Sequence, residues 1–124
     1  MSNNNTCKKT PKEYEEPKEK YIIVKTSDTT SKIRGDLYEA TRKYWKAKLD
    51  KAKKYKYVLS VIKGIVQEVY EVSEWYESPT KAPRIEFTGE KTDNKELQQL
   101  IGKRLPEKYM KRGAANPFMY KKNE

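Results

Sequence analysis

One stretch of the chain, Tyr57–Tyr76, is far more apolar than the rest, with the sequence YVLSVIKGIVQEVYEVSEWY. β-Branched and aromatic residues stand on both sides of Lys63-Gly64, which is typical of two antiparallel strands joined by a tight glycine turn. The first run is apolar at consecutive positions, and this predicts a central strand covered on both faces. The second run mixes polar and apolar residues, so one of its faces is expected to meet water. The hairpin is the predicted centre of the fold.

Shorter patterns before the hairpin predict the elements that lead into it. The apolar, β-branched run Tyr21–Val24 predicts a first strand, and Ser27–Gly35 is rich in turn formers and predicts a loop. Asp36 is a suitable N-cap for a helix that begins at Leu37, within a helical region that extends to Tyr55. The first 20 residues alternate lysine and glutamate, and we expect them to form a disordered or loosely attached charged tail.

After the hairpin, Arg84–Thr88 alternates polar and apolar residues, as a half-buried strand does, and Gly89–Asn94 is expected to turn. Asn94 caps a predicted short helix that ends at Gly102, and Phe118–Tyr120 predicts a closing strand. The element order favours a single α+β domain over residues 21–121. We expect a small, partly open, mostly antiparallel β-barrel with a helical insert after the first strand. Tight turns between the central strands argue against a doubly wound α/β fold.

The chain is strongly basic: 28 basic and 18 acidic residues give 124 residues a net charge of +10. This balance indicates a polyanionic partner, with nucleic acid as the first expectation and an anionic membrane surface as the second. An alternative stays open, because lysine also covers solvent-facing positions without any partner.

Several classes of chemistry are disfavoured by what the sequence lacks. There is no histidine, which removes the commonest general base, the Ser-His and Cys-His nucleophile pairs and most zinc sites. Glycine-rich phosphate loops and paired cysteines are also absent. We therefore expect no catalytic residue, no metal and no cofactor. Cys7 is the single cysteine, the N-terminus is polar, and no window approaches the roughly 18 apolar residues of a membrane span, so a cytoplasmic protein is expected.

The first candidate binding group is Arg34 together with Tyr38, Thr41, Arg42 and Trp45. Aromatic and arginine side chains on one helix edge are suited to stacking a base and holding a phosphate. Alternatively, Tyr38 and Trp45 pack onto the sheet while Arg42 bonds a carboxylate or a backbone carbonyl. Aromatic residues at helical spacing more often belong to a core, which favours packing for Trp45. For Arg42 both interpretations stay open.

Three further groups are candidates for contact with a ligand. Asn116, in the segment R-G-A-A-N-P-F-M-Y that begins at Arg112, has a donor and an acceptor for a base edge, or else caps a structural turn. Trp75, at the end of the hairpin, forms the rim of a pocket or caps the barrel. The lysines from Lys43 to Lys56 form a solvated face, or a phosphate track without sequence preference.

The order of these segments resembles a family. R-G-D-L-Y-E-A-T-R-K-Y-W, the hairpin to Trp75, R-I-E-F-T-G, I-G-K and R-G-A-A-N-P-F-M-Y are together similar to a group of small bacterial and phage proteins. Their layout resembles the PUA-like superfamily, which includes the ASCH and EVE domains. This resemblance implies a β-barrel with a helix over one mouth and a cleft that binds RNA or a modified base.

The sequence thus predicts a non-enzymatic module that binds nucleic acid or a nucleotide: RNA, single-stranded DNA or a modified base. The predicted binding residues are Arg34, Tyr38, Thr41, Arg42, Trp45, Trp75, Arg84, Arg112 and Asn116. A protein-interaction module, such as an accessory protein of a phage or a defence system, is the alternative. A small metal-dependent nuclease is the third, with Glu86 as the carboxylate that would test it.

Overall fold

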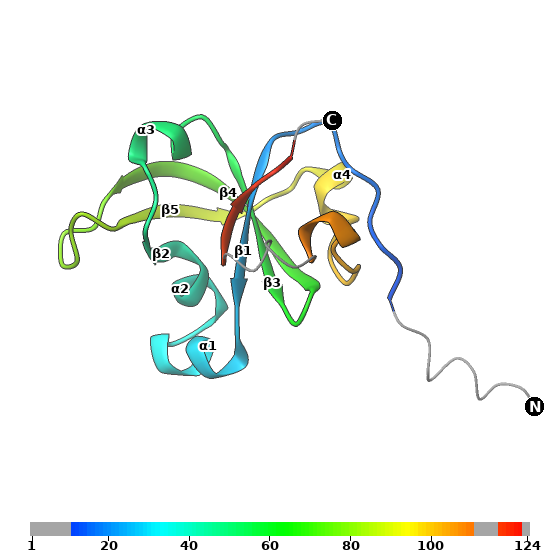
Figure 1. Ribbon diagram of the computed structural model, residues 1–124, viewed down its shortest axis with the longest axis horizontal. Coiled ribbons are helices and arrows are strands. Elements are labelled where there is room, and N and C mark those ends of the chain that lie inside the picture. Colours follow the sequence, from blue (N-terminus) through cyan, green and yellow to red (C-terminus); the bar gives the residue numbers. More distant parts are fainter. Residues whose placement is uncertain (1–10, 111–116, 123–124) are drawn as a thin grey trace, which may run out of the picture.

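The computed structural model describes residues 11–110 and 117–122, without the side chains of Ile33 and Arg34. Within these residues six strands form one curled sheet, a half-barrel, in the order β2-β5-β4-β3-β1-β6 (Figure 1). The strands are β1 (Tyr21–Thr26), β2 (Lys43–Trp45), β3 (Tyr57–Ile62), β4 (Ile65–Glu77), β5 (Ile85–Lys91) and β6 (Phe118–Tyr120). The helices are α1 (Asp28–Arg34), α2 (Leu37–Arg42), α3 (Leu49–Ala52) and α4 (Lys95–Gln98), with the 3-10 helix η2 (Glu107–Tyr109). The predicted α+β class is confirmed.

The predicted hairpin is also confirmed, as β3 and β4. Lys63 and Gly64 have φ angles of 52° and 80°, and a two-residue hairpin turn of type I′ needs positive φ at both positions. Val58 and Leu59 point to opposite faces of the sheet, and both are 0% exposed. β3 is therefore a central strand covered on both faces, as its sequence predicts.

The sheet is mixed. β1 runs parallel to β3, with Tyr21 opposite Tyr57, and the other four pairings among the described strands are antiparallel. A parallel neighbour requires a long crossover, which α1, α2, β2 and α3 supply. The expected helical insert thus lies where predicted, and the sheet stays open as a half-barrel.

The insert itself differs from the predicted one. Ser27 accepts a hydrogen bond from the backbone N–H of Thr30 and begins α1, in the segment predicted to be a loop. Asp36 caps α2 as predicted, by accepting from the N–H of Glu39 at 2.8 Å. The helix then ends at Arg42, because the next residues pair with β5 as strand β2. Pairing with the sheet therefore overrides the helical pattern at residues 43–45, while α3 forms within the remainder of the region predicted to be helical.

β5 also continues past its predicted end, through Gly89 to Lys91. Glycine is required at this point of the strand, because a Cβ atom on Gly89 would collide with the backbone carbonyl oxygen of Glu71 on β4. Downstream, the predicted N-cap is confirmed, because Asn94 accepts a hydrogen bond from the N–H of Leu97. The predicted helix end is wrong: α4 ends at Gln98 with Gln99 as its C-cap, and Gly102, with a φ of 87°, lies in the turn that follows.

Separate hydrophobic clusters cover the two faces of the sheet. One contains Leu59 and Tyr109 and lies under α4, η2 and residues 11–20. The other contains Val58 and Phe87 and lies under the crossover helices, which Figure 1 shows on the opposite side.

Residues 11–20 differ from the loosely attached tail expected from their composition. Tyr14 is 3% exposed, and its hydroxyl lies 2.8 Å from the hydroxyl of Tyr21. The carboxylate of Glu16 accepts hydrogen bonds from the hydroxyls of Tyr21 and Tyr109, at 2.8 and 2.9 Å. Tyr21 and Tyr109 belong to the first hydrophobic cluster. Residues 11–20 therefore pack against this cluster, although their composition is that of a charged tail.

We expect Tyr14→Ala to lower the free energy of unfolding by about 3 kcal/mol, because it removes a buried aromatic ring. The matched control is Glu15→Ala, one residue away on an exposed side chain, which should change stability by no more than about 0.5 kcal/mol. Urea denaturation of both variants measures the difference. If Tyr14→Ala and Glu15→Ala have the same free energy of unfolding, residues 11–20 do not pack against the first cluster.

Candidate nucleic-acid interface

The aromatic residues predicted to bind a ligand come together, but they do so inside the second hydrophobic cluster. Tyr38 and Trp75 lie against Phe87, with ring centroids 6.3 and 5.0 Å away. Trp45 and Trp75 lie against Phe118, at 5.9 and 6.0 Å. Tyr38 and Trp45 are half-buried and Trp75 is buried. For Tyr38 and Trp45, this geometry matches the alternative in which their rings pack onto the sheet.

The polar atoms of the same side chains are occupied by backbone groups. The hydroxyl of Tyr38 accepts from the N–H of Gly89 at 3.0 Å, and the indole N–H of Trp45 donates to the carbonyl of Thr41 at 2.8 Å. Thr41 is buried; its hydroxyl donates to the Leu37 carbonyl and lies 2.8 Å from the Ser60 hydroxyl. These contacts fix α2 and β2 against the sheet.

Arg42 is held by four hydrogen bonds within the protein. Its Nε donates to the carbonyl of Phe87 at 2.8 Å, and Nη1 donates to Glu39 at 3.0 Å. Its Nη2 donates to the Tyr76 hydroxyl at 2.6 Å and to Glu86 at 3.1 Å. This geometry matches the interpretation in which Arg42 bonds carboxylates and a backbone carbonyl of the protein. We call Arg42 and these partners the clamp. A phosphate would have to displace carboxylates that already bind the guanidinium.

The charges of this clamp stabilise one another. Burial by itself would raise the pKa of Glu39, but hydrogen bonds from Lys43 and Arg42 outweigh it and hold that pKa below its ordinary value. Burial and the hydrogen bond to Glu86 raise the pKa of the Tyr76 hydroxyl. Glu39 thus stays ionised and Tyr76 stays protonated at neutral pH.

Of the remaining predicted residues, Arg84 is the one whose side chain belongs to the described part of the chain. Arg84 donates from Nη1 to the carbonyl of Tyr44 at 3.2 Å, and it borders a hollow of about 470 Å³ with Lys46, Ala47 and Pro83. The side chain of Arg34 and the residues Arg112 and Asn116 lie outside the described part of the chain.

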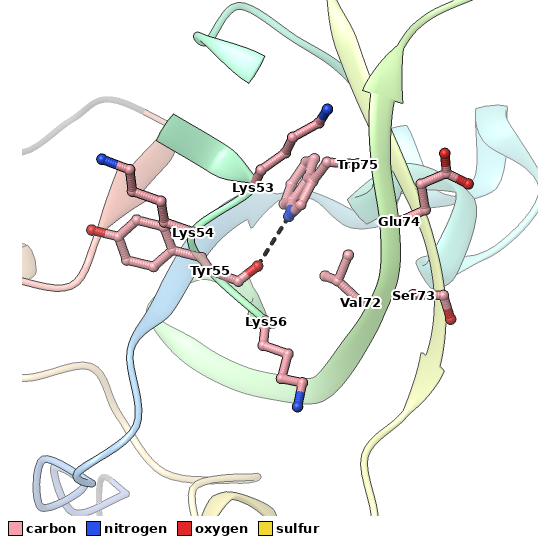
Figure 2. A pocket seen from close by; sticks show the side chains of 8 residues that line it. All are labelled: Lys53, Lys54, Tyr55, Lys56, Val72, Ser73, Glu74 and Trp75. Carbon is pink, nitrogen blue, oxygen red and sulfur yellow. Dashed lines mark hydrogen bonds between the residues drawn. The ribbon is translucent and has the colours of Figure 1, made fainter. Parts of the chain in front are cut away.

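A different surface, around α3, is hollowed and rich in lysine. A hollow of about 540 Å³ lies between residues 53–56 and residues 72–75 of β4, as Figure 2 shows. A second hollow of about 660 Å³ adjoins it, and Lys54 and Tyr55 line both. We call the lysines that line the two hollows the lysine surface: Lys20, Lys48, Lys51, Lys53, Lys54 and Lys56. Asp50 and Glu74 are the acidic residues of the two linings.

The local sequence explains why these lysines face outward. Leu49 and Ala52 are three residues apart, so they share the helix face that packs on the second cluster, and Ala52 is 0% exposed. Because this face packs on the sheet, the polar residues of α3 and of the turn after it lie on the opposite, solvent-exposed side. Lys48, Lys51, Lys53, Lys54 and Lys56 are all exposed.

Two hydrogen bonds fix the segment that separates the hollows. The indole N–H of Trp75 donates to the carbonyl of Tyr55 at 3.1 Å, drawn as the dashed line in Figure 2. The N–H of Val72 donates to the carbonyl of Lys56 at 2.7 Å. β4 shifts its register against β5 between Val72 and Glu74, which lets the strand curve around this segment. Trp75 therefore borders the first hollow from a buried position.

The linings of the two hollows carry an excess of positive charge, with six lysines against Asp50 and Glu74. Among the described residues, none of the six lysines forms an ion pair. Lys51 places its Nζ 4.2 Å from the ring centroid of Tyr120, and Lys20 places its Nζ 5.8 Å from that of Tyr55. Within residues 11–110 and 117–122, no carboxylate therefore pairs with these amino groups.

None of these six lysines is among the nine residues predicted to bind, although five of them belong to the lysine run from Lys43 to Lys56. Lys20 and Tyr55, which also line the hollows, were not considered as binding residues. Lys20 joins Lys56 because β1 and β3 are parallel and in register, Tyr21 opposite Tyr57, so the residues just before both strands meet at one end of the sheet. Tyr55 was predicted to be the last residue of the helical region. It lies beyond the end of α3, half-buried between the hollows. The lysine run from Lys43 to Lys56 was the available signal.

The comparisons with known proteins find no matching family model, no matching curated protein and no matching solved structure. The resemblance to the PUA-like superfamily therefore stays a prediction. In the part of the chain that is described, no helix has the length and apolar character needed to cross a bilayer.

Proposed function

We propose that this protein is a non-enzymatic module that binds nucleic acid through its lysine surface. The observation that carries the proposal is the gathering of six lysines around two adjoining hollows, without an ion pair among the described residues. Lysine is a compact charge on a flexible stem, suited to contacts with a phosphate backbone that do not depend on base sequence. The net charge of +10 favours the same partner.

The proposal keeps the partner predicted from the sequence and changes the residues that contact it. Tyr38, Thr41, Arg42 and Trp45 act as scaffold in this account, because their polar atoms bond groups of the protein itself. Trp75 keeps a role at the interface, since it holds the backbone of Tyr55 and lines the first hollow.

Fluorescence anisotropy with a labelled oligonucleotide of about 12 nucleotides tests the proposal. If three to six lysines contact phosphate, the affinity should fall roughly 20- to 300-fold between about 50 and 200 mM salt, because each contact releases a counterion. Vesicles of anionic lipid serve as the competitor in the same assay. No binding at low salt, affinity that ignores salt, or tighter binding to the vesicles would each contradict the proposal.

A further inference from the structure

Tyr55 occupies a special place on the lysine surface, because it lines both hollows. Its ring is backed by Tyr120, with the ring centroids 4.8 Å apart at an interplanar angle of 44°. Its backbone is fixed by the indole of Trp75. The residue is half-buried and lines both hollows, and the Nζ of Lys20 lies 5.8 Å from the centroid of its ring. A rigid aromatic ring flanked by lysines is thus presented to any bound polyanion.

This arrangement distinguishes between forms of nucleic acid. In a duplex, the faces of the bases are covered by neighbouring bases, and a protein aromatic ring cannot stack on them without unstacking the helix. In a single strand the faces are open, and binding surfaces for single strands combine a basic groove with aromatic side chains on which bases stack. The lysines alone would bind either a duplex or a single strand. The aromatic ring favours the single strand, because only there are the base faces open.

We infer that the ligand of the lysine surface is a single strand, with one base stacked on Tyr55 and the flanking phosphates held by lysines in the two hollows. This inference rests on the proposed function and adds the form of the ligand to it. Lys54 lines both hollows and is placed to contact the phosphate next to the stacked base. Lys20 and Lys56 meet at the end of the β1–β3 pair and border the second and first hollow respectively.

The experiment compares two ligands and three proteins in the same anisotropy assay. The ligands are a single strand of about 12 nucleotides and a strand of the same length with abasic sites in its central half, which keeps the phosphates and removes the bases. The proteins are the wild type, Tyr55→Ala and Tyr55→Phe. The wild type should bind the normal strand more tightly than the abasic strand, by roughly 5- to 150-fold, the range for one stacked base. Tyr55→Ala should lose this preference, and Tyr55→Phe should retain it because the ring remains.

A duplex of the same sequence completes the design, and thermal melting of each variant verifies that it is folded. The duplex should bind more weakly than the single strand, and Tyr55→Ala should leave its affinity unchanged. If nothing binds at low salt, the proposed function itself fails. If the wild type binds with the expected salt dependence but prefers the duplex, or does not distinguish the abasic strand, only the inference of a stacked single strand fails. The abasic comparison within the wild type decides the point even if Tyr55→Ala does not fold.

Discussion

Replacing Arg42 with alanine should lower the free energy of unfolding by about 3–5 kcal/mol. The substitution removes the guanidinium that bonds Glu86 and the carbonyl of Phe87. Glu86 is 5% exposed, so its carboxylate would be left buried with only the Tyr76 hydroxyl as a donor among the described side chains. An unpaired buried charge costs far more than an exposed ion pair contributes. Urea denaturation followed by tryptophan fluorescence measures the change.

The matched control is Arg104→Ala, which breaks an exposed ion pair with Glu13. Both side chains of that pair are 40% exposed, and the loss should be no more than about 1 kcal/mol. The double variant Arg42→Met with Glu86→Leu should regain part of the stability, because it removes both buried charges. If Arg42→Ala costs no more than Arg104→Ala, then Arg42 is not a structural clamp. Weaker nucleic-acid binding with unchanged stability would instead restore Arg42 as a phosphate contact.

Replacing Lys53, Lys54 and Lys56 with glutamine should weaken the binding of a single strand by about 500-fold at about 50 mM salt and about 30-fold at about 200 mM. The three side chains line the first hollow, and Figure 2 shows them extending outward from the segment that follows α3. The estimate assumes one phosphate per lysine and counterion release typical of single strands. Anisotropy with the labelled oligonucleotide measures both affinities.

A second triple variant controls for the loss of charge. Lys12, Lys95 and Lys103 are exposed and belong to segments on the other face of the sheet. Their replacement with glutamine changes the net charge by the same amount, but it should weaken binding by a much smaller factor, because distant charges are screened within about a Debye length. If the two triple variants weaken binding equally, the lysine surface is not the interface.

The elements that the sequence predicts correctly depend on local chemistry. Lys63-Gly64 specifies its turn, Asp36 and Asn94 cap their helices, and the apolar run of β3 specifies a strand with two covered faces. These features require no knowledge of distant parts of the chain, and a single sequence is sufficient to find them.

The errors in the predicted fold arise where a distant partner decides the structure. Residues 43–45 continue a helical pattern but form a strand, because β5 offers an edge with which to pair. The pattern of residues 11–20 is that of a solvated tail, yet Tyr14 and Glu16 bond tyrosines of β1 and η2. Nothing within these segments indicates the distant partner.

In the candidate interface, too, some features follow from the local sequence and others depend on distant parts of the chain. The lysine run up to Lys56 is visible in the sequence, whereas Lys20 joins it only through the parallel pairing of β1 with β3. The arginine and aromatic residues of α2 and β2 have the composition of a binding site. Whether such a residue binds a ligand or supports the fold depends on whether a carboxylate or a carbonyl of the protein lies within hydrogen-bond distance. Arg42 bonds one of each, the carboxylate of Glu86 and the carbonyl of Phe87.

If the lysine surface contacts phosphate, the salt dependence of affinity must change when its lysines are removed. The measurement is the slope of log K against log salt for the variant lacking Lys53, Lys54 and Lys56, compared with the control variant lacking Lys12, Lys95 and Lys103. The slope should be shallower by about 2 in the first variant, since each lost phosphate contact removes about 0.7. Equal slopes in the two variants would contradict phosphate contact at the lysine surface.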